Sequence, residues 1–221
     1  MKTLEEAKHQ FLAKIYELDK HLSTLQKLIQ ETGEELEGNC FYEHHTFTFR
    51  PELLMKQINL FWAGSESTKI CEIGFNAGHS ALLFFLGNPK LKSFVIFDVC
   101  THKYVKPCLE YIATQFQDTE IEVHIGDSKV SVPNYLLRHT ESFRSFDLVH
   151  VDGGHDEHCI KSDMIYADKL VCINGIIIID DTDNSLISSY VDKYLATGRY
   201  KELNILETTG YKHRMIQKLS D

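Results

Sequence analysis

The sequence contains no apolar run long enough to cross a membrane. A membrane-spanning helix needs about 20 consecutive apolar residues, and no stretch of this chain approaches that length. The N-terminal residues MKTLEEAKHQ also lack the apolar centre of a signal peptide. We therefore expect a cytoplasmic protein that does not act at a membrane.

Basic residues are too few for a surface that binds nucleic acid. The 221 residues include 23 Lys and Arg against 32 Asp and Glu, which gives a formal net charge of −9. Affinity for nucleic acid depends on Lys and Arg side chains that neutralise phosphates. The composition therefore disfavours a nucleic-acid partner and favours a small-molecule substrate.

Closely spaced cysteines are missing as well. The six cysteines are scattered and include no CxxC motif. Because zinc sites and redox pairs need closely spaced thiols, we expect neither, and we expect the cysteines to be reduced. They stand at positions 40, 71, 100, 108, 159 and 172.

Apolar residues, in contrast, are plentiful. Hydrophobic residues make up 43% and charged residues 25% of the chain, which is not the composition of a disordered protein. A chain of 221 residues can bury one core but is short for two. We therefore expect one folded domain with an appendage.

A narrow apolar stripe runs through residues 4–29. Its spacings of three and four residues are typical of one face of a helix. The stripe consists of Leu4, Phe11, Ile15, Leu18, Leu22, Leu25 and Ile29. Gly33 suits the end of this helix. The stripe covers fewer than four heptads, so the helix could dock on its own subunit or form a homodimer, and both alternatives stay open.

A polar and aromatic segment, residues 38–50, separates this helix from a second one. Pro51 suits the first turn of the second helix, and Gly64 suits its end. We expect residues 1–66 to form an N-terminal helical or lid segment. Residues 67–221 then form the main domain.

The main domain shows strands that alternate with helical patterns. Five apolar, β-branched runs predict strands at 69–74, 93–98, 120–126, 146–152 and 175–181. Near-continuous apolar strands are typical of a parallel sheet covered by helices on both faces. Residues 201–219 predict two more strands with a tight turn at Thr209 and Gly210, which makes the last strand antiparallel. The expected fold is therefore an α/β, Rossmann-like, seven-stranded and mostly parallel sheet.

A glycine-containing turn follows the first predicted strand. Gly74 and Gly78 allow a tight strand-to-helix turn and a close approach of ligand to backbone, although Asn76 replaces the middle glycine of dinucleotide folds. Asp98 ends the next strand, where an acid can accept hydrogen bonds from both ribose hydroxyls. The turn and the acid together indicate a cofactor that contains adenosine.

These motifs resemble those of class I S-adenosylmethionine-dependent methyltransferases. The likeness rests on EIGFNAGHS at 72–80, IFD at 96–98 and IGDS at 125–128, and it extends over roughly residues 68–218. It implies that the glycine turn binds the methionine part of the cofactor, that Asp98 binds the ribose, and that Asp127 and Ser128 bracket the adenine. The residues implied for the methionine part are Gly74, Asn76, Ala77, Gly78 and Ser80.

Glu72 has two interpretations. Its negative charge could add to a field that suits the sulfonium cation of the cofactor. Alternatively, its side chain could turn towards a structural partner. The sequence leaves both roles open.

Three carboxylates follow the fourth and fifth predicted strands. Asp152 ends one strand, and Asp180 and Asp181 end the other, so we expect them at the same edge of the sheet as the glycine turn. Two carboxylates about 4 Å apart repel by roughly 4 kcal/mol at an effective dielectric constant of 20. A magnesium or manganese ion would remove that cost. The alternative is that such aspartates cap the following helices, although Asp156 and Asp183 could serve as caps instead.

The acid set resembles that of metal-dependent O-methyltransferases of the catechol and macrolide-sugar types. The likeness implies that Asp152, Asp180 and Asp181 hold the metal and that His155 is the general base, with Asp152 also part of the catalytic group. The Asp–Asp pair is similar to the sugar type. We therefore predict metal-assisted O-methylation of a small-molecule hydroxyl.

Two other functions remain as alternatives. The first is a catalytically silent methyltransferase-like subunit that binds the cofactor or a partner. The second is an NAD-dependent oxidoreductase, which would use the same ribose acid but normally has a glycine in place of Asn76.

Overall fold

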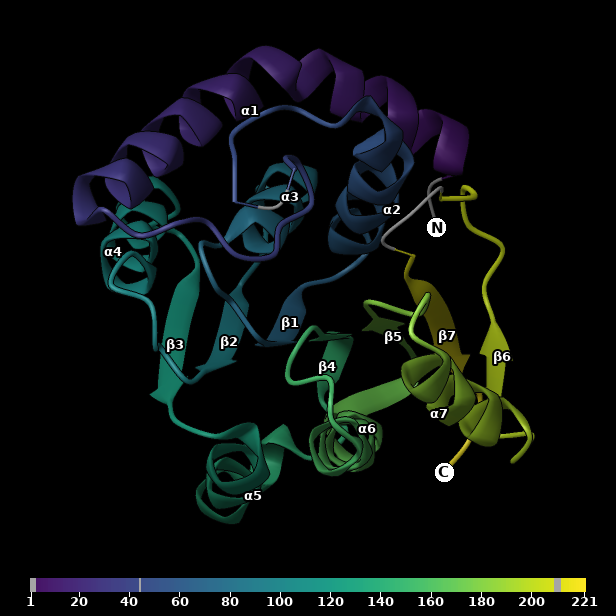
Figure 1. The fold of residues 1–221 in the computed structure, drawn as a ribbon. Helices are drawn as coiled ribbons and strands as arrows, with labels where there is room; N and C mark the ends of the chain where they lie inside the picture. The colour runs from purple at the N-terminus through teal and green to yellow at the C-terminus, as the bar shows by residue number, and fades with distance from the viewer. Residues whose placement is uncertain (1–2, 44, 209–211) are drawn as a thin grey trace.

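A mixed β-sheet forms the centre of the protein, with helices on both faces (Figure 1). The computed structural model describes residues 3–43, 45–208 and 212–221. Within these residues, seven strands lie in the order β3-β2-β1-β4-β5-β7-β6. The strands are β1 Lys69–Ile73, β2 Ser93–Asp98, β3 Glu120–Ile125, β4 Phe146–Val151, β5 Val171–Ile179, β6 Tyr200–Glu202 and β7 Arg214–Lys218.

The predicted architecture is confirmed. The pairs from β3 to β5 are parallel, and β7 is antiparallel to both β5 and β6. The predicted tight turn at Thr209 and Gly210 lies outside the described residues. The predicted division at residue 66 stays a prediction.

Strand β5 begins earlier than its sequence pattern predicts. Val171 pairs with Phe146, and the register shifts before Leu148 pairs with Ile176. A Cβ on Gly175 would lie 2.7 Å from the side chain of Val171, so the irregular stretch needs glycine there. Asn174 and Gly175 interrupt the apolar pattern, so the sequence did not reveal the start of the strand.

The helices divide between the two faces of the sheet. The longest, α1, arches over α2, α3 and α4, and the opposite face carries α5, α6 and α7 (Figure 1). The helices are α1 Leu4–Thr32, α2 Leu54–Ser65, α3 His79–Gly87, α4 Val105–Gln115, α5 Ser128–Arg138, α6 Glu157–Leu170 and α7 Ser185–Leu195, with short 3₁₀ turns at Pro51–Leu53 and Thr140–Ser142. Among the described residues, no helix has the length and apolar character that a membrane span requires.

Helix α1 begins and ends with clear local signals. The Thr3 hydroxyl accepts the Glu6 N–H and the Glu6 carboxylate accepts the Thr3 N–H, which forms a capping box. Gly33 ends the helix in the left-handed conformation, with φ 72°, as predicted. Most of the predicted stripe is buried against the subunit's own helices, but Ile15 is 44% exposed.

Gly64 does not end helix α2 but lies inside it. A Cβ on Gly64 would lie 2.6 Å from the Cα of Phe84, and a Cβ on Gly87 would lie 2.4 Å from the carbonyl oxygen of Phe61. The two glycines therefore let the backbones of α2 and α3 touch. This packing carries α2, from the N-terminal segment, close to the sheet.

Asp168 in α6 is expected to stabilise the C-terminal strands. Its carboxylate accepts hydrogen bonds from Tyr200 Oη and Arg199 Nη1 and lies 3.2 Å from Nζ of Lys218, which is 1% exposed. Lys218 Nζ also lies 3.3 Å from Asp221 Oδ1, so Asp168→Asn would remove one of the two carboxylates beside the buried ammonium. We expect the free energy of unfolding to fall by about 2 kcal/mol in urea denaturation.

The matched control for this prediction is Asp192→Asn. Asp192 pairs with Arg214, but its side chain is 67% exposed, so we expect a change under about 0.5 kcal/mol. Burial opposes ionisation of Asp168, but Tyr200 and Lys218 still lower its pKa below the ordinary value of 3.8. The stabilisation is therefore complete above that value and lost as the pH falls through the lowered pKa. A gap between Asp168→Asn and wild type that did not narrow as the pH fell through the lowered pKa would contradict this assignment.

Candidate functional site

A cleft of about 550 Å³ lies at the carboxyl ends of the strands. It opens where the strand order reverses between β1 and β4, which is where open α/β sheets bind ligands. Its walls come from the loops after β1, β2, β3, β4 and β5, and from Lys56 and the segment 37–42 of the N-terminal region. The structure therefore brings the predicted turn and acids to one hollow.

The glycine turn has the conformation that its residues predict. Gly74 and Gly78 have φ of 91° and 77°, and Asn76 also has a positive φ of 52°. A Cβ on Gly74 would lie 2.0 Å from the carbonyl oxygen of Asp152. The turn therefore passes directly against the end of β4, and only glycine fits there.

Asp98 organises this turn. Its Oδ2 accepts the N–H groups of Phe75 at 2.7 Å and Asn76 at 2.9 Å, and its Oδ1 accepts the N–H of Cys100 at 2.6 Å. An ionised carboxylate has about four acceptor sites. Asp98 lines the cleft, so it keeps capacity for one further donor, such as a ribose hydroxyl.

The other predicted cofactor residues occupy different places. Ala77, Ser80 and Ser128 line the cleft, as does Asp127, whose carboxylate caps α5 by accepting the Lys129 N–H at 2.9 Å. The side chain of Asn76 instead donates to the carbonyl oxygens of Glu37 and Gly38. It thereby ties the N-terminal segment to the turn.

Glu72 lies beneath the cleft and not in its wall. Its Oε1 accepts the Ser80 hydroxyl at 2.5 Å and is 2.9 Å from His150 Nδ1. Burial raises the pKa of Glu72, and the contact with His150 opposes that rise. Of the two roles left open by the sequence, the geometry favours that of a structural partner.

The acids after β4 and β5 separate into two groups. Ligand atoms of His150, Asp152 and Asp180 lie within 4.8 Å of one another. Asp181 instead pairs with His155, with 2.7 Å between Oδ2 and Nε2. His155 is 60% exposed and lines the cleft, and its hydrogen bond to Asp181 raises the pKa of the imidazole.

The sequence around the cleft identifies the family. A family described as "Methyltransferase domain" matches residues 71–182, which is more than half of the chain. The chain belongs to this family of methyltransferases. The match covers β1 to β5 and therefore the strand ends that form the cleft.

Solved structures of methyltransferases share this fold at low sequence identity. An O-methyltransferase from Bacillus cereus is 17% identical, with 90% of this chain and 91% of that chain covered and a TM-score of 0.61. The O-methyltransferase TomG from Streptomyces achromogenes is 16% identical, with 90% of each chain covered and a TM-score of 0.59. PaMTH1 from Podospora anserina is 15% identical, with coverages of 77% and 83% and a TM-score of 0.57. No curated protein matched the sequence.

The predicted membership of the class I S-adenosylmethionine-dependent methyltransferases is thus confirmed. The family match establishes the type of enzyme, and the structural neighbours establish the fold. The choice of acceptor and the role of a metal depend instead on the side chains around the cleft.

The sequence analysis missed Lys56, a basic residue in this methyltransferase cleft. Its Nζ lies 2.6 Å from Asp180 Oδ1, and the two side chains are 4% and 7% exposed. Burial opposes both charges, yet Lys56 and His150 lower the pKa of Asp180, and Asp180 and Asp152 raise that of Lys56. A signal existed in the sequence, because Lys56, Gln57 and Asn59 interrupt an otherwise apolar helix.

The predicted divalent cation does not fit this arrangement of side chains. Asp180 Oδ1 already accepts Lys56 Nζ and the Asp181 N–H, and Asp181 Oδ2 is engaged by His155. Within the described residues, His150 Nε2 is buried without a hydrogen-bond partner, but it lies 4.0 Å from Asp180 Oδ2. Asp180 therefore pairs with a cation that the protein itself supplies, and Asp181 is engaged by the imidazole of His155.

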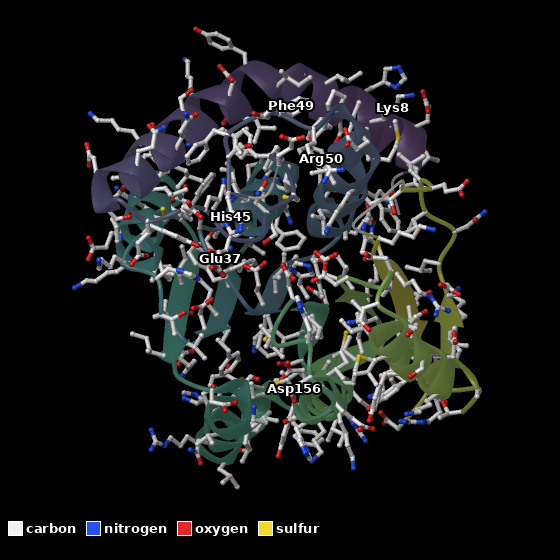
Figure 2. The ribbon with its side chains drawn as sticks, viewed as in Figure 1. Lys8, Glu37, His45, Phe49, Arg50 and Asp156 are labelled. Carbon is white, nitrogen blue, oxygen red and sulfur yellow. The ribbon has the colours of Figure 1, made fainter. Side chains whose placement is uncertain are left out.

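The segment between α1 and α2 covers the glycine turn. Cys40 and Tyr42 are buried and line the cleft, and the Gln57 side chain donates to the Cys40 carbonyl at 2.8 Å. Figure 2 shows Glu37 and His45 on this segment. His44 of the same segment lies outside the described residues.

Of the two aspartates considered as helix caps, Asp156 and Asp183, one caps a helix and the other does not. Asp156, labelled at the start of α6 in Figure 2, accepts the N–H groups of His158 and Cys159 and is the predicted cap. Asn184, and not Asp183, caps α7 by accepting the Leu186 N–H at 2.9 Å. None of the three predicted metal ligands is therefore needed as a cap.

Proposed function

We propose that this methyltransferase transfers a methyl group from S-adenosylmethionine to a hydroxyl of a small molecule. The observation that carries the proposal is the His155–Asp181 pair at the cleft. Asp181 engages Nε2 of His155, so the neutral imidazole keeps Nδ1 as its basic atom. A base held in this way suits the removal of a hydroxyl proton. O-methyltransferases among the structural neighbours support the same reaction.

Each part of the cleft has a role in this proposal. S-adenosylmethionine supplies the methyl group as an electrophilic sulfonium. The turn at 74–78 holds its methionine part, Asp98 binds the ribose, and Asp127 and Ser128 flank the adenine. His155 takes the acceptor proton while the cleft walls align the oxygen with the methyl group. Asp152 contributes negative potential near the sulfonium.

Calorimetric titration with S-adenosylmethionine, S-adenosylhomocysteine and NAD tests the cofactor. We expect both adenosyl sulfur compounds to bind and NAD not to bind. A methyl-release assay over sugars, phenols and long-chain alcohols then tests the reaction. Cofactor binding without turnover on any acceptor would favour the silent subunit, and NAD binding alone would favour the oxidoreductase.

Substitution of His155 separates its chemical role from cofactor binding. We expect His155→Gln to lower the methyl-transfer rate roughly a hundredfold while the affinity for S-adenosylmethionine stays unchanged. The control is His158→Gln, because His158 is exposed on α6 and does not line the cleft. An undiminished rate in His155→Gln would remove this residue from the mechanism.

A homodimer through α1 is proposed separately. Leu12, Ile15 and Tyr16 are 45%, 44% and 74% exposed on that helix and could form its contact surface. Sedimentation velocity of the wild-type chain and of Tyr16→Lys tests this. A wild-type monomer at all accessible concentrations would contradict the proposal.

A further inference from the structure

A lysine ammonium lies where the carboxylates of the cleft predict a metal ion. We propose that Lys56 is the resident cation of the Asp152–Asp180 cluster and that the enzyme therefore works without a divalent metal. The proposal assigns a role in the site to a residue of the N-terminal segment. Its statement about metal binding is independent of the acceptor, and its statement about the reaction rests on the proposed function.

Lys56 is buried, and its ammonium donates to Asp180. Its side chain is 4% exposed, so bulk water contributes little to solvating the ammonium. A buried charge without a partner is strongly destabilising. The 2.6 Å contact with Asp180 therefore holds the lysine charged inside the protein.

The oxygens of Asp180 and Asp181 are already used by groups of the protein. Asp180 Oδ1 accepts both Lys56 Nζ and the Asp181 backbone N–H, the latter at 2.8 Å. Asp181 has a φ of 51°, and its side chain reaches His155 and not Asp152. A metal would have to displace both contacts before it had three carboxylate ligands.

Charge repulsion opposes the binding of a divalent metal ion next to the Lys56 ammonium. At the same separation, an ammonium and a divalent ion repel twice as strongly as two monovalent cations. Lys56 cannot withdraw to solvent without leaving the interface between α2 and the sheet, where its neighbours Gln57 and Asn59 are also buried. The lysine therefore excludes the ion by charge and by position.

The Lys56 ammonium can also stabilise a negatively charged oxygen, as a metal ion would. An ammonium has three N–H donors, and within the described residues Lys56 donates one of them to Asp180. Lys56 lines the cleft beside Asp180 and Asp181. Its positive charge lowers the cost of an ionised acceptor oxygen, which is the effect of a Lewis acid in this position.

Manganese binding tests the proposal without any acceptor. The wild-type chain is treated with EDTA, freed of the chelator and titrated with Mn²⁺, and free Mn²⁺ is measured by electron paramagnetic resonance. We expect no stoichiometric binding to wild type or to Lys56→Arg, which keeps the charge. We expect Lys56→Met to bind Mn²⁺ at least about tenfold more tightly, because Asp152 and Asp180 then lack a counter-charge. Thermal unfolding of each protein with and without Mn²⁺ gives a second readout.

Several results would overturn the proposal. One equivalent of Mn²⁺ bound by wild type, and lost in Asp152→Asn, would show that the ion and the lysine coexist. An unchanged affinity in Lys56→Met would show that the lysine is not what excludes the ion. If Lys56→Met does not fold, the wild-type and Lys56→Arg titrations decide alone. Once an acceptor is known, activity lost with EDTA and restored by Mg²⁺ would also contradict it, whereas failure to find any acceptor affects only the proposed function.

Discussion

Replacing Gly74 by Ala is expected to destabilise the fold by about 4 kcal/mol and to abolish cofactor binding. A Cβ at this position would lie 2.0 Å from the carbonyl oxygen and 2.7 Å from the carbonyl carbon of Asp152. Both are backbone atoms, so a rotamer change cannot relieve the clash. The φ of 91° adds strain for any residue with a side chain.

The consequence of this clash extends along β1 and β4. The Asp152 N–H donates to the Ile73 carbonyl at 2.8 Å, and the Gly74 N–H donates to the Phe97 carbonyl at 2.8 Å. Moving Gly74 away from Asp152 would strain both hydrogen bonds and shift the turn that faces the cofactor. Urea denaturation and titration with S-adenosylhomocysteine measure the two effects.

The matched control is Gly198→Ala. Gly198 also has a positive φ, 71°, but a Cβ there would meet nothing within 4 Å. Gly198→Ala therefore measures only the cost of a side chain in the left-handed backbone conformation, which is about 1 kcal/mol. If Gly74→Ala were no less stable than Gly198→Ala, the turn would not pass as close to the end of β4 as described.

The sheet could be predicted because its signals are local. Strands β1, β2, β4 and β5 contain apolar runs, as strands covered on both faces do, whereas the edge strand β3 alternates apolar and polar residues. The turn at 74–78 and Asp98 were also predictable, since both lie at the ends of neighbouring strands. The start of β5 was not, because Asn174 and Gly175 form an irregular stretch that resembles a turn.

The partners of the buried charges could not be predicted. Glu72 meets His150 because the two residues stand opposite each other in the parallel register of β1 and β4, which the sequence does not specify. Lys56 meets Asp180 across 124 positions of the chain, through the packing of α2 on the sheet. Such contacts depend on tertiary structure, although a lysine within an apolar helix was a visible anomaly.

The divergence of Asp180 and Asp181 has a local cause. Successive side chains of a strand point to opposite faces, so two adjacent acids after β5 do not automatically converge. The left-handed conformation of Asp181 then directs its carboxylate to His155. The resemblance to metal-dependent enzymes implies that the two acids act as one pair, whereas in the structure Asp180 pairs with Lys56 and Asp181 with His155.

Replacing Asp98 by Ala is expected to weaken S-adenosylmethionine binding by more than about a hundredfold, or roughly 3 kcal/mol. The substitution removes the proposed ribose acceptor. It also leaves the N–H groups of Phe75, Asn76 and Cys100 without their acceptor, so the glycine turn loses its order before the cofactor arrives. Calorimetry with S-adenosylmethionine and S-adenosylhomocysteine measures the loss.

A second substitution distinguishes the two functions of Asp98. Asp98→Asn keeps one carbonyl oxygen for the turn but removes the negative charge and one acceptor. If Asp98 binds the ribose, this variant should retain most of the stability of the wild type in urea and still lose roughly tenfold in cofactor affinity. If both variants lose stability but bind the cofactor with wild-type affinity, Asp98 only orders the turn. The adenosine would then be held by Asp127 and Ser128, without an acid at the ribose.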